Sequence, residues 1–116
     1  MKRNLLQTVV ETPEFIKQAK SCMGDKEKTE FINFIAENPS AGDLIQGTGG
    51  ARKIRWYADI HKGKSGGARI IYYYHDQHIP IFLFTAYKKN QKADLTAAEK
   101  KILHKIVRLI IAEYER

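Results

Sequence analysis

Three segments rich in β-branched and aromatic residues follow one another between residues 52 and 88, with short polar turns between them. They cover residues 52–59, 68–75 and 79–88. Valine, isoleucine, tyrosine and phenylalanine favour strands, and strands joined by short turns pair in antiparallel fashion. The chain must therefore build its fold on a three-strand meander, and most of that sheet needs cover on both faces.

The N-terminal third predicts a strand followed by two short helices. Residues 4–11 are rich in leucine and valine, which favours a strand, and Thr12 and Pro13 then form a helix start. A second helix is expected from Asp25, which would cap it, to Asn38. The expected apolar faces are Phe15, Ile16, Ala19, Cys22 and Met23 in the first helix, and Phe31, Phe34 and Ile35 in the second.

The C-terminal segment predicts one long amphipathic helix. Thr96 and Glu99 have the spacing of a capping box. Apolar residues then recur at intervals of three and four, so most of this stripe is expected to pack on the domain itself, with any excess serving a protein partner. The stripe consists of Leu95, Ala98, Ile102, Ile106, Leu109, Ile110 and Tyr114, widened by Leu103, Val107 and Ile111.

These elements predict one α+β domain over residues 1–116, a mainly antiparallel twisted sheet in the order strand, helix, helix, three-strand meander and C-terminal helix. Residues 40–50 are expected to form a loop, with Leu44 and Ile45 anchored in the core. The glycines of this loop do not match a phosphate-binding loop, because no lysine follows Gly47. They favour a crossover that passes close to neighbouring elements.

The positive charge is concentrated on the predicted meander. Residues 52–92 hold nine lysines and arginines against two acids, which equals the whole chain's formal charge of +7. A basic sheet interleaved with tyrosines suggests a partner made of phosphates and bases. The alternative is a solvated basic face that serves only solubility.

Several classes of site are not indicated. Cys22 is the single cysteine, which excludes an internal disulfide and suits a reducing cytosol. His75 and His78 flank a predicted turn without further ligands, so neither a metal nor a cofactor is expected. The apolar run near the N-terminus is too short for a signal peptide, and no run is long enough to span a membrane. We expect a soluble, cytoplasmic protein.

The basic residues could converge on one site if the three strands are adjacent. Lys53 and Arg55 share one predicted strand face, Arg69 lies on the next strand, and Tyr87 and Lys89 lie at the end of the third. Metal-free RNA cleavage is one reaction that such a set can support, because the ribose 2′-hydroxyl supplies the nucleophile while the protein neutralises phosphoryl charge and moves protons. Arginine is suited to binding the phosphate, and a lysine among other cations could act as the general base. Tyr87 could stack on a nucleobase or orient the 2′-hydroxyl. Binding of phosphate without catalysis is the simpler alternative.

Four linked motifs in this order resemble the RelE/HigB family of bacterial toxins, and most closely its HigB-type branch. They are residues 45–55 (IQGTGGARKIR), 66–73 (GGARIIYY), 87–90 (YKKN) and 94–96 (DLT), and the similarity covers about residues 40–100. The resemblance implies a RelE-like fold and a ribosome-dependent endoribonuclease that cuts mRNA in the ribosomal A site. It also implies neutralisation by a cognate antitoxin, with a helix-turn-helix of the HigA type.

The resemblance implies five catalytic residues. Lys53 matches a catalytic lysine, Arg55 a second lysine, Arg69 the arginine at the scissile phosphate, and Lys89 (or Lys88) a further arginine. Leu95 stands where RelE has a tyrosine, and Tyr87 is the nearby substitute, so which residue is base and which is acid stays open. The residues expected to bind RNA or the ribosome are Arg52, Lys62, Lys64, Lys88 and Lys92.

Two other functions remain open from the sequence. One is non-enzymatic inhibition of DNA gyrase, as in ParE relatives that share the fold, and the other is a basic RNA-binding module. Fold alone does not decide among them.

Overall fold

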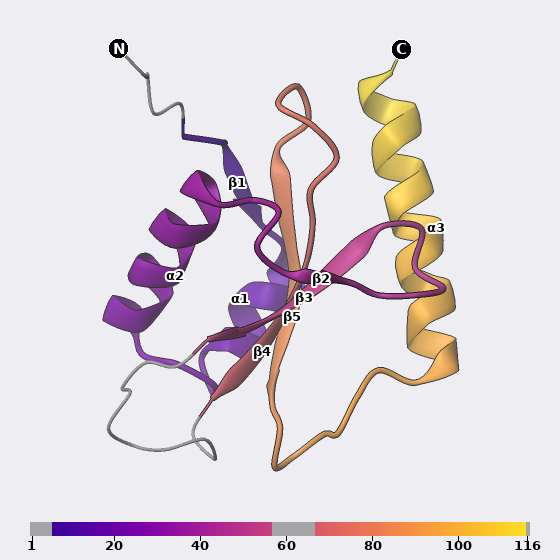
Figure 1. The fold of residues 1–116 in the computed structure, drawn as a ribbon. Coiled ribbons are helices and arrows are strands. Elements are labelled where there is room, and N and C mark those ends of the chain that lie inside the picture. The colour runs from indigo at the N-terminus through magenta and orange to yellow at the C-terminus, as the bar shows by residue number, and fades with distance from the viewer. Residues whose placement is uncertain (1–5, 57–66, 116) are drawn as a thin grey trace.

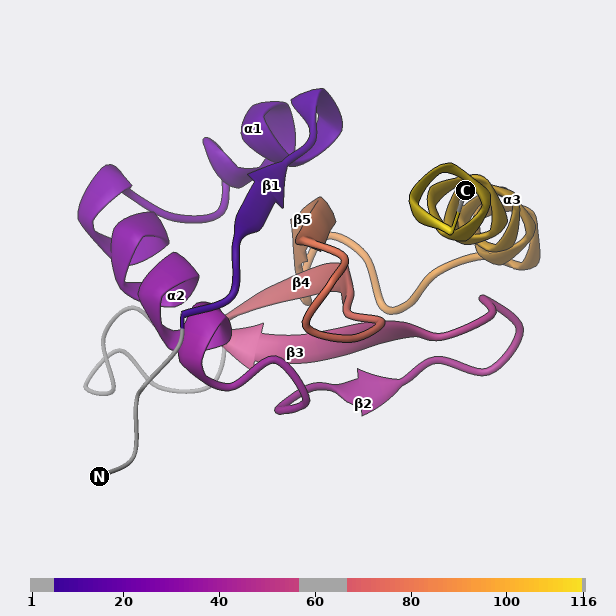
Figure 2. The ribbon, with the colours of Figure 1, turned by 90° about the horizontal axis from the view of Figure 1, so that it is seen from above.

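The computed structural model describes residues 6–56 and 67–115. Along the chain the elements are β1 (Val9–Glu11), α1 (Pro13–Ala19), α2 (Asp25–Glu37), β2 (Asp43–Leu44), β3 (Ala51–Trp56), β4 (Ala68–Tyr73), β5 (Ile81–Lys88) and α3 (Ala97–Tyr114). The sheet has the strand order β1-β5-β4-β3-β2, in which β1 is parallel to β5 and the other pairs are antiparallel. This confirms the α+β class and the meander. Figures 1 and 2 show α1 and α2 on one side of the sheet and α3 on the other.

The two short helices form as the sequence predicts, with small shifts at their ends. The Thr12 hydroxyl accepts a hydrogen bond from the Phe15 backbone N–H, and Pro13 is the first helical residue. Helix α1 ends at Ala19, earlier than expected, although Cys22 and Met23 are buried in the same core. Asp25 is not the cap of α2, because Gly24 holds that position and Asp25 lies in the first turn. Its carboxylate there still favours the positive end of the helix dipole.

The face that α3 turns to the sheet differs from the predicted stripe. Leu103 and Val107 are buried, whereas Ile102 and Leu109 are 58% and 70% exposed. The expectation that most of the stripe packs was therefore wrong for Ile102 and Leu109. Ile106 and Tyr114 are partly exposed, and the Tyr114 ring lies 6.2 Å from that of Phe82 of β5. Two neighbouring apolar stripes run along this helix, and the sequence pattern does not decide which of them meets the sheet.

Residues 40–50 contain a short strand that the sequence did not predict. In β2, Leu44 pairs with Arg52 of β3 and is 65% exposed, so its expected role as a core anchor was wrong. Ile45 does pack against the core on the α3 side. The glycines act as expected in a close crossover: Gly49 has a φ of 76°, and a Cβ there would lie 2.6 Å from the His104 ring of α3.

A β-bulge divides β5 into two halves. Tyr72 of β4 pairs with Leu83, but the preceding Ile71 pairs with Thr85, so Phe84 is an extra residue in the ladder. Before the bulge, Leu83 faces α1 and α2; after it, Ala86 faces them, and Phe84 and Tyr87 both face α3. The bulge thus changes which residues of β5 point toward α3.

Candidate functional site

Three of the predicted catalytic residues form one row across the sheet. Arg55 of β3 pairs with Arg69 of β4, and Arg69 pairs with Tyr87 of β5. Ile54 and Trp56 pack toward α1 and α2, so Arg55 and Lys53 project to the α3 face, where Tyr87 also lies. Neighbours on adjacent strands have Cβ atoms about 4.5–5.5 Å apart, so the row forms one continuous surface.

The centre of this row is a buried arginine. Arg69 is only 7% exposed, and its Nη1 has no hydrogen-bond partner among the described residues. No carboxylate in the described part of the chain forms an ion pair with it. A guanidinium does not lose its proton in proteins, and a buried donor without a partner costs free energy. An anion bound at this point would satisfy both the charge and the donor.

Tyr87 lies beside Arg69 with a hydroxyl that is also buried and without a partner. Burial raises the pKa of the phenol above its ordinary 10.0, the Asp94 and Glu99 carboxylates raise it further, and Arg69 opposes them. The hydroxyl is therefore protonated at neutral pH. With 8% of the residue exposed, the ring offers little surface for stacking on a base.

Lys53 lies in the adjacent row of the ladder, and its nearest partner was not expected. Its Nζ is 3.4 Å from Oδ1 of Asp94, in the segment that connects β5 to α3. The Leu95 N–H donates to the same oxygen and, with the positive charges of Lys53 and Lys100, lowers the pKa of Asp94 below its ordinary 3.8 against the effect of desolvation. Lys53 thus faces an ionised carboxylate and not only other cations. The sequence marked Asp94 only as part of the DLT motif at residues 94–96.

The other predicted cations do not join this row. Arg52 points to the opposite face and donates to the Gly42 and Ser40 carbonyls, and Lys88 pairs with Ala68, whose side chain lies on the α1 and α2 side. Lys92 forms an ion pair with Glu99. Lys89 is exposed in the turn after β5, near the end of the row. Lys62 and Lys64 lie outside the described residues.

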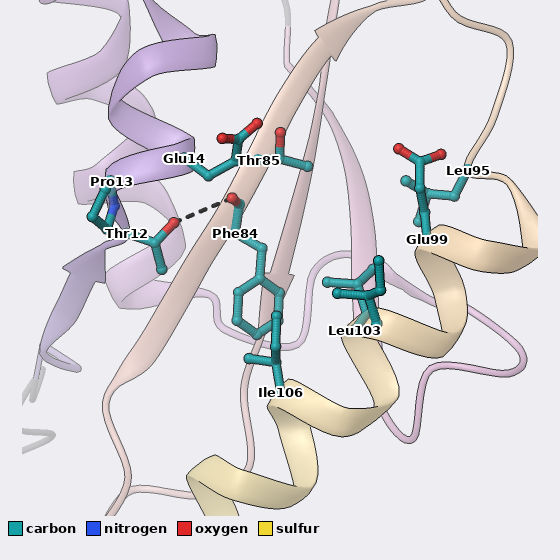
Figure 3. Close-up of a pocket in the computed structure, with 10 residues that line it drawn as sticks. Thr12, Pro13, Glu14, Phe84, Thr85, Leu95, Glu99, Leu103 and Ile106 are labelled. Carbon is teal, nitrogen blue, oxygen red and sulfur yellow. Dashed lines mark hydrogen bonds between the residues drawn. The ribbon is translucent and has the colours of Figure 1, made fainter.

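A groove runs beside the row, between α1 and α3. Two cavities of about 310 and 170 Å³ share Glu14, Thr85, Leu95 and Glu99 as lining residues, so they are two parts of one groove. Figure 3 shows Glu14 of α1 and Glu99 of α3 on opposite walls, with Thr85 of β5 between them. The larger part is apolar, with Phe84, Leu103 and Ile106, while the smaller part reaches Tyr87 and is polar. No pattern in the sequence predicts this groove, because its walls come from three distant segments.

Two negative findings concern the described residues. Within residues 6–56 and 67–115, no three histidine, cysteine, aspartate or glutamate side chains are grouped so as to hold a metal ion. None of the helices described is long and apolar enough to cross a membrane.

The chain was compared with protein-family models and with solved structures. No protein-family model matches the chain. Among solved structures, the chain is similar to the Escherichia coli toxin RelE, in a mutant with two arginines replaced by alanine, in the free state. The TM-score is 0.55 at 15% sequence identity, and the match covers 84% of this chain and 95% of that one. The architecture is thus RelE-like.

Proposed function

We propose that this chain, with its RelE-like fold, is the toxin of a type II toxin–antitoxin system and a ribosome-dependent endoribonuclease that cuts mRNA in the ribosomal A site. One observation carries the proposal: Arg69 is buried without a partner for Nη1, beside the unpartnered hydroxyl of Tyr87 and in register with Arg55. A phosphodiester would supply an anionic oxygen as the partner of Arg69, and the neighbouring ribose hydroxyl would supply a hydrogen-bond partner for Tyr87.

The chemistry needs no group beyond the row, the two lysines Lys53 and Lys89 near it, and the substrate. The ribose 2′-oxygen attacks the adjacent phosphorus, the bond from phosphorus to the 5′-oxygen breaks, and a 2′,3′-cyclic phosphate and a 5′-hydroxyl result. Arg69 and Arg55 neutralise the non-bridging oxygens, because guanidinium groups bind phosphate with a rigid fork. Tyr87 orients the 2′-hydroxyl through its own hydroxyl.

Proton transfer is assigned to the lysines of the site. One proton leaves the 2′-hydroxyl and one reaches the departing 5′-oxygen, and Lys53 and Lys89 are the candidates for these two roles. Asp94 holds Lys53 at 3.4 Å in the free protein. A phosphodiester at Arg69 would compete with Asp94 for the ammonium group, so substrate binding itself would release Lys53 toward the reacting atoms.

Partners follow from the same proposal. The cluster of positive charge over residues 52–92 would steer the chain to ribosomal RNA, with Arg52, Lys62, Lys64, Lys88 and Lys92 as contacts outside the row. A cognate antitoxin, with a helix-turn-helix, would neutralise the toxin in the cytoplasm. Neither a metal nor another cofactor has a part in the scheme.

The test is induction of the protein in growing bacteria, followed by mapping of new 5′ ends in cellular transcripts. We expect translation to stop and new ends to appear within translated codons. Arg69→Met should abolish these ends, whereas Arg108→Met, an exposed position on α3, should leave them unchanged. Intact messages together with DNA damage would refute the nuclease and support the gyrase alternative; binding of RNA without new ends would support the plain binding module.

A further inference from the structure

Helix α3 carries a row of apolar side chains that the domain itself does not cover. Ile102 and Leu109 are more than half exposed, and Ile106 is partly exposed. Spacings of four and three residues place these three side chains on one side of the helix, next to the buried Leu103 and Val107. A contiguous apolar row at the surface is typical of a contact with another protein.

This apolar row borders the larger part of the groove between α1 and α3. Ile102 and Ile106 line that cavity of about 310 Å³ together with Phe84 of β5. Figure 3 shows Ile106 and the Phe84 ring on this wall, across from Pro13 of α1. A groove with helices as its walls and anchors at i, i+4 and i+7 accepts the apolar side of one further helix.

Three cations follow the apolar row along its outer side. Lys101, Lys105 and Arg108 each precede one of the three apolar residues in the sequence, so they form a second row on the same helix. All three are exposed, and none forms an ion pair with a carboxylate within residues 6–56 and 67–115. A partner that covers the apolar row would bring its flanking side chains against these cations, which favours aspartate or glutamate there.

The carboxylates of the groove do not cancel this preference. Glu99 forms an ion pair with Lys92, and Glu14 lies on the opposite wall, on α1. Acidic side chains in the partner are therefore favoured on one flank of its apolar stripe, the flank that faces the cationic row.

Two other occupants fit this surface less well. In an antiparallel two-fold contact between two copies of α3, Lys105 would face Lys105 and Lys101 would face Arg108, and each chain has a formal charge of +7. Nucleic acid would neutralise the cations but would leave the apolar row in water. A helix that is apolar on one side and acidic on the adjoining flank satisfies both rows at once.

We propose that the two rows of α3 and the adjoining groove bind an amphipathic helix of another protein, with an acidic flank. Its apolar side chains fill the groove beside Ile102 and Ile106, and its carboxylates pair with the cationic row. The inference goes beyond the proposed nuclease, because the surface contains neither Arg69 nor Tyr87.

The experiment is a selection of displayed peptides against the full chain. The library consists of helices about four turns long, with a fixed apolar stripe and with glutamate or lysine at random on either side of it. We expect glutamate to be enriched on one flank, and the selected peptide to shift the backbone amide signals of Ile102 and Ile106. Ile102→Asp should weaken binding about tenfold or more, whereas Leu44→Asp, at an exposed position of β2, should leave it unchanged.

Charge reversal tests the cationic row separately. Selection against the double variant Lys101→Glu with Lys105→Glu should enrich lysine where glutamate was enriched before. The matched double variant Lys20→Glu with Lys26→Glu, at exposed positions after α1 and in α2, should still select glutamate.

Several results would overturn the proposal. They are the absence of any enriched peptide, equal use of glutamate and lysine on both flanks, and amide shifts outside α3 and the groove. Shifts along α3 with a single-stranded RNA oligonucleotide, in a chain that selects no peptide, would assign the cationic row to nucleic acid instead.

Discussion

Replacement of Arg69 by methionine should stabilise the protein while it removes cleavage. Arg69 is 7% exposed and has a buried donor without a partner, and methionine can fill the space of the arginine stem without any polar atom. Removal of a buried group whose hydrogen bond or charge has no partner raises the free energy of unfolding by about 1–3 kcal/mol. At about 2.1 cal/mol/K per residue for 116 residues, this free energy raises the melting temperature by about 4–12 °C.

The opposite effect is expected on activity. Arg69 would bind the phosphoryl oxygens in the transition state, and loss of one such donor lowers the rate about 10²–10³-fold. Thermal unfolding followed by circular dichroism gives the first quantity, and primer extension on mRNA in a reconstituted translation reaction gives the second.

Two variants control for size and charge. Arg108→Met, on the exposed side of α3, should change stability by less than about 0.5 kcal/mol and keep full cleavage. Arg69→Ala should be less stable than Arg69→Met, because it leaves a cavity. A clear fall in melting temperature for Arg69→Met would mean that the guanidinium is well satisfied in the free protein, and retained cleavage would mean that the phosphate binds elsewhere; either result refutes the reasoning.

Three further predictions concern the elements around the site. Leu103→Ala should cost about 2–5 kcal/mol in urea unfolding and Leu109→Ala less than about 0.5 kcal/mol, because only Leu103 is buried; equal costs would contradict the placement of α3. Thr96→Ala should cost about 1 kcal/mol through loss of the capping box, and an unchanged unfolding midpoint would contradict this. The pKa of Asp94 is lowered in the fold, so its stabilising effect is complete above 3.8 and is lost as the pH falls through the lower folded value. Asp94→Asn should thus melt below the parent protein at pH 6 but together with it at about pH 2, and a constant difference at all pH values would exclude this linkage.

Local signals in the sequence predicted most elements of the fold. Thr12 with Pro13, and Thr96 with Glu99, are complete helix starts within four residues, and both were confirmed. The strands β3, β4 and β5 follow from composition and alternation, which also placed Lys53 and Arg55 on one face. Such signals succeed because capping and alternation depend on neighbours in the chain.

Contacts between distant segments could not be predicted in the same way. Lys53 and Asp94 are 41 residues apart, and nothing in either segment indicates the other. The stripe of α3 that packs on the sheet was likewise undecided, since Ile102 and Leu103 are both apolar and only one of them is buried. In each case the choice is made by tertiary packing.

The bulge in β5 shows why the row itself needed the structure. Strict alternation from Leu83, which faces α1 and α2, would turn Tyr87 to that same face, away from Arg69. The extra residue Phe84 reverses the phase, so that Tyr87 joins the α3 face and Ala86 takes the place in the opposite core. No glycine lies in or beside this part of β5 to signal a bulge. Pairing with β1 thus determines which way the side chains of the first half of β5 point, and the bulge determines the direction in the second half. Tyr87 lies beside the buried Arg69 only because the two halves are out of phase.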